Sequence, residues 1–399
     1  MVSPVASARF LGVFLDRKLS WKSHCEAVEK KLKTQDFALA RIAGKTWGPS
    51  LAKAREVYTK CIRSAIAYGA SSYHTPTPPG GQPTGPAKRL AKAQNRSLRI
   101  VAGAYKATPI RHLEIETWVP PLDLYLNKRL ADFEARIGTP RALPWAPAGA
   151  PEVRTGSIIQ EACSKLARRG QRNRARARGR RPPAGPPAPT ATERATITVE
   201  RWATGRVGLA LEEALGLGDR GPEEALTEEW KRRWEAAAAA RERDRGPGAP
   251  QRLADRDPNF SDQVLQRYEG LNKAQSSLLV QARTGAIGLK DFLFTVGVPE
   301  VVTPHCTCGI GRETVEHLVV WCLNPPIQRY WEPNILSSSR DLQWALQGFN
   351  PRARRLAGRV LAWLMDSGRL LEYSLARRLA QEKDLEELEQ GLDPRDGWA

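Results

Sequence analysis

The sequence predicts a mainly α-helical protein. Apolar residues recur at intervals of three and four over several stretches, which is the spacing of one helix face, whereas a single short apolar run is typical of a β-strand. A Pro- and Arg-rich segment interrupts the helices, and four Cys and His residues gather late in the chain. We therefore predict a helical region over 1–137, a basic linker over 138–196, a helical connector over 197–250, a Cys/His module over 251–330 and an amphipathic tail over 331–399.

The first predicted element is a strand over Phe10–Leu15, followed by the turn-like residues Asp16–Lys18. The pattern offers no second strand beside it, and a lone strand leaves its backbone N–H and C=O groups unpaired. We therefore expect this strand to complete a larger domain that begins before the chain does.

Four helices are predicted in the first region, each from an apolar stripe at helical spacing. The helix over Trp21–Ala43 carries Val28, Leu32, Phe37 and Leu39 on its stripe. The helix over Leu51–Tyr68, stopped by Gly69, carries Ala54, Val57, Tyr58, Cys61, Ile62 and Ala65. The other two run over Lys88–Ala102 and over Pro121–Ile137, the last with Leu122, Leu126, Leu130 and Phe133.

The later part of the chain alternates between linker and helix. Residues 138–196 contain many prolines, a short helical pattern over Ser157–Arg169 and an arginine block over Arg168–Arg181 without acidic residues, so we expect a disordered linker. Helices are then predicted over Glu223–Arg243, over Gln263–Arg283 with Gly285 as C-cap, and, as one or two amphipathic helices, over Ala353–Leu392. The apolar stripe of this tail consists of Leu356, Val360, Leu364, Leu371, Leu375 and Leu379.

The charge of the chain indicates a polyanionic partner. Its 62 Lys and Arg residues outnumber 43 Asp and Glu residues, which gives a formal net charge of +19. Because each cation near a phosphate releases a condensed counterion, we expect RNA or DNA as the partner. A basic surface without a dedicated ligand is the alternative. No apolar run reaches the ~18–20 residues that span a bilayer, so we expect no membrane partner, an intracellular and nuclear location, and reduced thiols.

The strongest local signal is a Cys/His cluster with the spacing C-x-C-x8-H-x4-C, formed by Cys306, Cys308, His317 and Cys322. Four ligands of this type complete a tetrahedral site, so we predict a structural Zn²⁺ in a small CCHC zinc knuckle. A buried thiol cluster with a core histidine is the alternative.

Local geometry is consistent with this site. Gly309 and Gly311 let the backbone turn around an ion, and Thr314 can cap a short helix that carries His317. Residues five apart point about 140° away from each other on an α-helix. Cys322 should therefore lie where the helix unwinds, ahead of the stop at Asn324-Pro325-Pro326.

The remaining thiols and the adjacent histidine are predicted to have no part in the site. His305 is expected to be a neighbour of the ligands. Cys25 and Cys61 are expected to be core residues, and Cys163 has no predicted partner.

Several segments together resemble non-LTR retrotransposon reverse transcriptases. The stretch Phe10–Asp16 with Leu19-Ser20-Trp21 and His24 is similar to the segment that leads from the polymerase palm into the helical thumb, and Gln94–Arg99 with Pro109–Leu126 resembles the helices that follow. Ser276–Gly285, Gly288-Leu289, Phe292-Leu293 and the Cys/His cluster are similar to the C-terminus of fungal Tad-type elements. The resemblance covers most of 8–137 and 225–330 and implies a thumb-like helical region ahead of the zinc knuckle.

The resemblance implies binding without catalysis. The paired aspartates of the family's polymerase palm have no counterpart in this sequence. Between 140 and 260 there is no acidic set of the RNase H kind, since Asp255, Asp257 and Asp262 lack strands to present them. We therefore expect a non-enzymatic, nucleic-acid-binding part of such a polyprotein, with the polymerase portion of the same element as a further partner.

The predicted nucleic-acid contacts fall on the basic helix, on the arginine block and around the Cys/His cluster. They are Lys88, Arg89, Lys92, Arg96, Arg99, Arg172, Arg174, Arg176, Arg178, Arg180, Arg181, Arg283, Lys290 and Arg312. Trp321 either stacks on a base or packs as a core residue beside the metal. For the basic helix the alternative is a solvated face, and for Arg283 it is a helix-end charge. Two further readings stay open for the whole chain, a protein-interaction role through the tail and a degenerate remnant without selected function.

Overall fold

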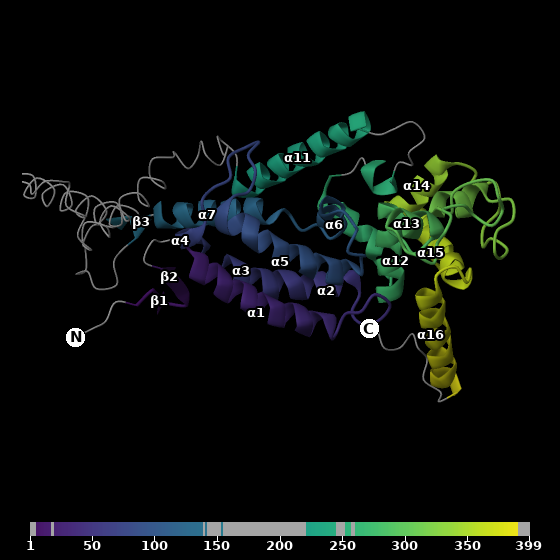
Figure 1. Ribbon diagram of the computed structural model, residues 1–399, viewed down its shortest axis with the longest axis horizontal. Coiled ribbons are helices and arrows are strands. Elements are labelled where there is room, and N and C mark those ends of the chain that lie inside the picture. The colour runs from purple at the N-terminus through teal and green to yellow at the C-terminus, as the bar shows by residue number, and fades with distance from the viewer. Residues whose placement is uncertain are drawn as a thin grey trace, which may run out of the picture. The chain divides into compact units, whose positions relative to one another are not determined.

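The computed structural model describes residues 5–16, 20–138, 140–141, 153–154, 221–244, 252–256 and 260–389. Within these ranges the protein is mainly helical and its strands are confined to two short antiparallel hairpins, which confirms the predicted fold class (Figure 1). The arginine block, including the predicted contacts Arg172, Arg174, Arg176, Arg178, Arg180 and Arg181, lies outside the described residues, as does the short helix predicted over 157–169. No helix of the described part is long and apolar enough to cross a membrane.

Two compact units make up the chain. One consists of Met1–Lys33, Arg63–Ala93 and Pro120–Arg233, and the other of Thr34–Ile62, Gln94–Val119 and Trp234–Ala399. Each unit therefore combines segments that are far apart in the sequence, unlike the five consecutive regions predicted above.

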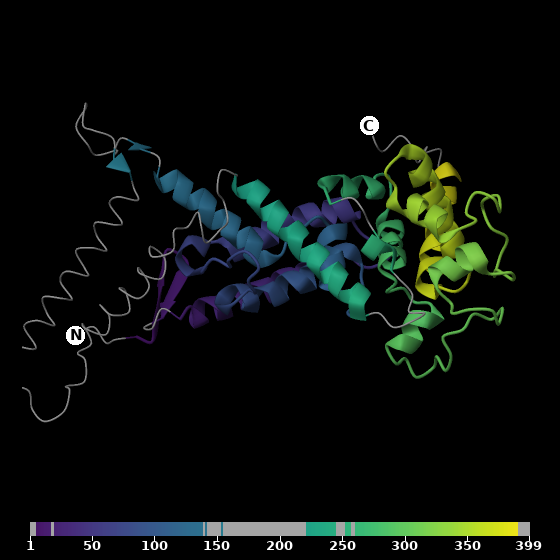
Figure 2. The same cartoon turned by 90° about the horizontal axis from the view of Figure 1, so that it is seen from above.

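The first unit begins with a hairpin instead of the predicted single strand. Strands β1 (Ser7–Phe10) and β2 (Val13–Asp16) pair antiparallel, with Phe10 opposite Val13, and are the purple arrows of Figure 2. Leu11 and Gly12 form the turn, with φ of 45° and 83°, as two-residue hairpin turns require. The Tyr68 hydroxyl donates to the Leu11 carbonyl at 2.6 Å. Leucine rarely adopts positive φ. The apolar run over Phe10–Leu15 was therefore predicted as one strand, although it contains the turn.

Helix α1 (Lys22–Ala40) follows the hairpin and was predicted. Its Leu32 and Leu39 are buried as expected, but Phe37 is exposed. In the first unit α7 (Leu122–Gly138) packs on α4 (Ala70–Tyr73) and buries Leu122, Leu126 and Leu130. Helix α11 (Pro222–Asp244) matches the prediction over 223–243, and the pair β3 (Pro140–Arg141) and β4 (Val153–Arg154) forms the second hairpin.

The helix predicted over Leu51–Tyr68 contains a π turn. It runs as α2 (Leu51–Val57), the π turn η1 (Tyr58–Ile62) and α3 (Arg63–Ala67). A π turn inserts extra backbone into one helical turn and shifts all later positions around the axis. The buried side chains are accordingly Ala54, Tyr58, Ile62 and Ile66. Cys61 is exposed, so the prediction that it is a core residue was wrong.

The second unit is built around α12 (Lys273–Thr284), of which almost every side chain is buried. It packs against α2, α6 (Ile110–Glu116), the 3₁₀ turn η2 (Leu253–Arg256) and α15 (Pro351–Asp366). Asn272 and Gln275 form a capping box at its start, and Gly285 ends it at φ 69°, as predicted. The single helix predicted over 263–283 is wrong, because the 3₁₀ turn η3 (Asp262–Tyr268) and Gly270 at positive φ precede α12.

The tail forms α14 (Ser339–Gln347), α15 and α16 (Leu371–Glu389), with α14 packed along α15 (Figure 1). Leu356, Val360 and Leu364 of α15 are buried as predicted. The predicted stripe does not continue into α16, where Leu371, Leu375 and Leu379 are 79%, 50% and 55% exposed. The chain turns at Gly368 (φ 68°) between α15 and α16, so the apolar stripe of α15 does not continue on the same face of α16.

Candidate metal centre

The metal centre starts with a tight turn that carries two cysteines. His305 and Arg312 form an isolated antiparallel bridge at the base of the turn. Inside it the Cys306 amide donates to the Gly311 carbonyl at 2.8 Å and the Gly309 amide to the Cys306 carbonyl at 3.0 Å. Gly309 has φ 79°, a conformation that glycine adopts without strain. The glycine-rich sequence therefore folds back locally and places Cys306 and Cys308 on one side of the turn.

The other two ligand residues lie at the ends of a π turn. The Thr314 hydroxyl accepts a hydrogen bond from the His317 amide at 3.1 Å, as predicted for a cap. The π turn η4 (His317–Trp321) follows, and the Cys322 amide donates to the His317 carbonyl at 2.7 Å. Bonds from i to i+5 bring residues five apart close together. Cys322 itself is extended (φ −67°, ψ 119°), which confirms that the helix unwinds there.

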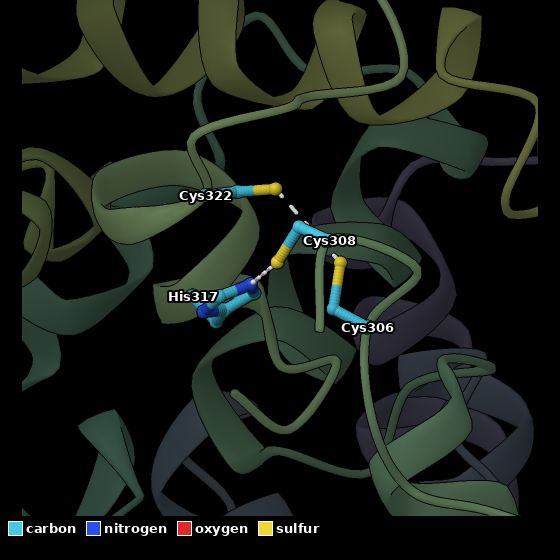
Figure 3. A group of neighbouring side chains, drawn as sticks. All are labelled: Cys306, Cys308, His317 and Cys322. Atoms are coloured by element: carbon cyan, nitrogen blue, oxygen red, sulfur yellow. Dashed lines mark hydrogen bonds between the residues drawn. The ribbon is translucent and has the colours of Figure 1, made fainter. Parts of the chain in front are cut away.

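The four side chains converge on one point. Figure 3 shows Cys306, Cys308, His317 and Cys322 pointing toward one another, and their ligand atoms all lie within 4.8 Å of each other. The Cys306 and Cys322 sulfurs are 3.8 Å apart, and the Cys308 sulfur is 3.1 Å from His317 Nε2. Cys306, His317 and Cys322 are buried, while Cys308 is partly exposed. Together they form a Cys₃His group that could hold a metal ion; His305 lies outside it, as predicted.

Burial and backbone amides set the protonation of these groups. A hydrogen bond from the backbone at Ile310 lowers the pKa of the Cys308 thiol. Burial raises the pKa of Cys322 to about 11 and lowers the pKa of His317. The histidine is therefore neutral, which is the form that ligates a metal. Of these two thiols, Cys308 ionises more readily, so it is the first candidate to meet an ion as a thiolate.

Gly311 and Arg329 support the site from outside. A Cβ at Gly311 would lie 2.9 Å from His317 Nδ1 and 3.3 Å from its Cε1, so only glycine leaves room for the imidazole ring. The Arg329 guanidinium donates to the Cys322 carbonyl at 2.8 Å and to the Leu318 carbonyl at 3.2 Å. These bonds satisfy carbonyl groups that the end of a helical turn leaves free.

Arg283 is placed differently from the prediction. Its side chain is fully buried, so it is not available to a polynucleotide in this structure. Arg283 Nε donates to Glu116 Oε1 at 2.8 Å, and Arg267 Nη1 donates to Glu116 Oε2 at 3.1 Å. The Tyr268 hydroxyl donates to the same carboxylate. The prediction for Arg283 is therefore corrected: because a buried charge needs a partner, this arginine neutralises Glu116 inside the fold.

The other predicted residues near the metal centre lie at or near the surface. Arg312 is exposed and pairs with Asp291 through Nε. Lys290 is partly buried, and its amide donates to Glu313 Oε1 at 3.3 Å. Trp321 is 50% exposed, so the alternative that it is a core residue beside the metal was wrong.

The basic helix, α5 (Gly85–Ala102), combines structural and exposed cations. Arg89 donates twice to the Glu29 carboxylate, at 2.8 and 2.7 Å, and Arg96 donates to Asp36 at 3.2 Å. Arg99 donates to the Asn95 carbonyl at 3.0 Å, and burial lowers its pKa. Lys88 and Lys92 are exposed.

Sequence reasoning missed an exposed arginine stripe on α15. Arg352, Arg355 and Arg359 are exposed at intervals of three and four, which places them on one face of the helix. The sequence contained this pattern, because the three arginines lie between the apolar positions of the predicted helix, away from the stripe of Leu356, Val360 and Leu364. The sequence also contained no sign that Asp255 pairs with Arg111 and His112.

Comparisons of the chain with protein families, with curated proteins and with solved structures found no match.

Proposed function

We propose that Cys306, Cys308, His317 and Cys322 bind a structural Zn²⁺. Three thiolates and one imidazole are a donor set typical of closed zinc sites. Zn–S bonds of about 2.3 Å at a tetrahedral angle separate two sulfurs by about 3.8 Å, which is the distance between the Cys306 and Cys322 sulfurs. All four positions are protein ligands, so the ion would have no open position for a substrate and would stabilise the local fold.

We further propose that the protein binds RNA or DNA through the surface around this zinc site. The observation that carries this proposal is the half-exposed Trp321, which directly precedes the ligand Cys322 in a chain of net charge +19. Ile310 and Leu323 of the same Cys/His segment are exposed as well. A rigidly held indole at the surface can stack on an unpaired base, and such stacking tolerates any sequence.

Exposed cations would supply the phosphate contacts. In the unit that contains the zinc site, Arg352, Arg355 and Arg359 project from α15 at helical spacing; Lys88 and Lys92 of α5 belong to the other unit and would make a separate contact. The arginine block over 168–181 adds cations without acidic neighbours in the sequence. Because phosphate contacts release counterions, binding through these groups would weaken steeply with added salt.

The order of sequence blocks supports a place for the chain in the C-terminal part of a non-LTR retrotransposon polyprotein. Its role there would be binding of template-primer, element RNA or target DNA beside the polymerase portion. A non-catalytic role is part of the proposal. Asp255, one of the acidic residues considered for a nuclease, is engaged by Arg111 and His112.

Metal analysis of the purified full chain tests the zinc site. The wild type should retain about one equivalent of zinc by mass spectrometry, and Cys308→Ser should lose most of it. Cys61→Ser is the matched control, since Cys61 is exposed and outside the Cys₃His group. Equal metal content in all three proteins, or none in the wild type, would refute the site.

Fluorescence anisotropy with labelled single-stranded RNA and DNA tests the binding function. We expect affinity to fall steeply with salt, and Trp321→Ala to weaken binding about 5- to 150-fold, as the loss of ~1–3 kcal/mol of base stacking implies. Trp344→Ala is the control, because Trp344 is also exposed but lies on α14. Binding that ignores salt and both substitutions would contradict the proposal.

A protein-interaction role is the second candidate, and one observation favours it. Leu371, Leu375 and Leu379 form an exposed apolar stripe on α16. Association through such a face would depend weakly on salt, whereas polynucleotide binding depends on it strongly.

A further inference from the structure

A second group of charged side chains lies in the unit that contains the metal centre, at some distance along the chain from the four ligands. We name it the Asp255 cluster, and it consists of Arg111, His112, Arg241, Arg252 and Asp255. Asp255 Oδ1 is its centre: it is 2.8 Å from His112 Nε2 and 3.8 Å from Arg241 Nη1, and it accepts a hydrogen bond from Arg111 Nη2.

Positive charge is in excess in this cluster. Among the residues that the structure describes, the guanidinium groups of Arg111 and Arg241 lie against the Asp255 carboxylate, and Arg252 lies near enough to Arg241 and Asp255 to interact with both electrostatically. Burial lowers the pKa of Arg111 to about 10 and also lowers the pKa of Arg252. Arg241 and Arg252 lower the pKa of Arg111 further through repulsion. Since partly buried charge is costly without a counter-charge, two of the three positive charges in the cluster still lack one.

Hydrogen-bonding capacity is also left over. Arg111 Nε and His112 Nδ1 are buried and have no hydrogen-bond partner in the described part of the chain. His112 is completely buried, and the Trp234 ring lies 5.7 Å from its ring and 5.4 Å from the Arg111 guanidinium. The packed indole holds Arg111 in place, so the guanidinium is pre-positioned for a further acceptor.

An anion can reach the cluster from solvent. Arg241 is 43% exposed along its side chain. Arg252 lines a cavity of about 240 Å³ together with Arg312 and the acidic residues Asp291, Glu313 and Glu316, of which Asp291 pairs with Arg312 and Glu313 with Arg369.

We propose that Arg111, Arg241 and Arg252 form a binding site for a phosphate group. Guanidinium forks bind phosphate oxygens in pairs, which suits three arginines around an anion better than isolated surface charges do. The phosphate has two sources, a free anion such as pyrophosphate or the backbone of a polynucleotide. If the phosphate belongs to a polynucleotide, the site is part of the proposed nucleic-acid surface, and that source rests on the proposed function.

Two substitutions and one control test the site in the full chain. Arg241→Gln and Arg252→Gln each remove a cluster cation. Arg243→Gln is the control, because Arg243 is exposed on α11, as Arg241 is, but lies outside the cluster. Pyrophosphate affinity is measured from thermal shifts against sodium chloride of equal ionic strength. We expect about a ten-fold loss for Arg252→Gln, a several-fold loss for Arg241→Gln and no change for Arg243→Gln.

Two further measurements separate loss of the phosphate site from loss of folding, and a free anion from a polynucleotide. Without pyrophosphate, Arg252→Gln should melt no lower than the wild type, because the substitution relieves repulsion. With a labelled oligonucleotide, both cluster variants should lower the slope of log affinity against log salt by about one relative to Arg243→Gln.

Each result decides one point. Equal pyrophosphate affinity in all variants overturns the phosphate site, even where the oligonucleotide binds. Pyrophosphate binding that depends on the cluster, without oligonucleotide binding, supports the site and identifies a free anion as its source, while the proposed function fails.

Discussion

Gly311 shows how closely the metal centre constrains a single residue. A Cβ at position 311 would lie only 2.9 Å from Nδ1 of the His317 ring, which is closer than a Cβ can come. Gly311→Ala should therefore displace the imidazole and weaken zinc binding about 10- to 100-fold, the range seen when groups that orient metal ligands are lost. Competition with a chromophoric chelator measures this affinity. Unchanged affinity would mean that the ring can move without cost.

His24 makes stability depend on pH. Its imidazole is buried beside Tyr73, Nδ1 accepts from the Phe14 amide, and burial lowers its pKa. Below about pH 6.5 the unfolded chain gains a proton that the folded protein does not bind. Stability should therefore fall as the pH drops below about 6.5, as judged by urea unfolding at pH 7.5 and 5.5.

The His24→Gln variant provides the control for this effect. It should be less stable than the wild type at pH 7.5 but lose less stability on acidification. His112 and His317, whose pKa values burial also lowers, keep part of the dependence in the variant. Parallel losses in both proteins would show that His24 does not contribute.

Single residues were predictable from the sequence where their partners are close along the chain. The four residues of the Cys₃His group fall within one short segment, so their spacing was enough to predict the group. Arg283 pairs with Glu116 from 167 positions away, and Arg89 with Glu29 from 60 positions away. No local pattern shows that such arginines are neutralised inside the fold.

At the scale of elements, helix ends were predicted better than helix continuity. Gly285 and the Thr314 hydroxyl act where the sequence placed them, because caps are local hydrogen-bond arrangements. The π turns η1 and η4 were not predicted, because the apolar spacing was interpreted as an uninterrupted α-helix, whereas a π turn shifts the later positions around the axis. In η4 this extra residue is what brings Cys322 back toward His317.

Helix α15 offers a prediction about one element. Gly358 lies inside the helix, and a Cβ there would meet no atom within 4 Å. Gly358→Ala should stabilise the protein by about 0.5–1 kcal/mol, because alanine loses less backbone entropy on forming a helix. Urea unfolding measures the change. Destabilisation would indicate that this face of α15 is covered, and the variant also serves as a remote control for Gly311→Ala.

For the whole molecule, net charge was predictable but its distribution was not. The total of +19 follows from composition. Which cations stay exposed depends on pairing across the fold: Arg283 is neutralised by Glu116 inside it, whereas Arg352, Arg355 and Arg359 remain at the surface. The structure consequently shows which cations are exposed, whereas the sequence shows only how many there are.

Metal removal distinguishes a local role of zinc from a global one. The amides of Cys306 and Cys322 are bonded only within the small turn and the π turn, to Gly311 and His317. Helices α12 and α15 instead have buried apolar faces of their own, including Leu278, Val280, Val360 and Leu364. We expect a chelator to raise hydrogen exchange across 304–323 by opening this segment, while α12 and α15 remain protected. Cys308→Ser should give the same pattern without chelator. Loss of protection throughout α12 and α15 would instead make the ion essential for the whole unit, and unchanged exchange at 304–323 would mean that no ion had been holding the segment.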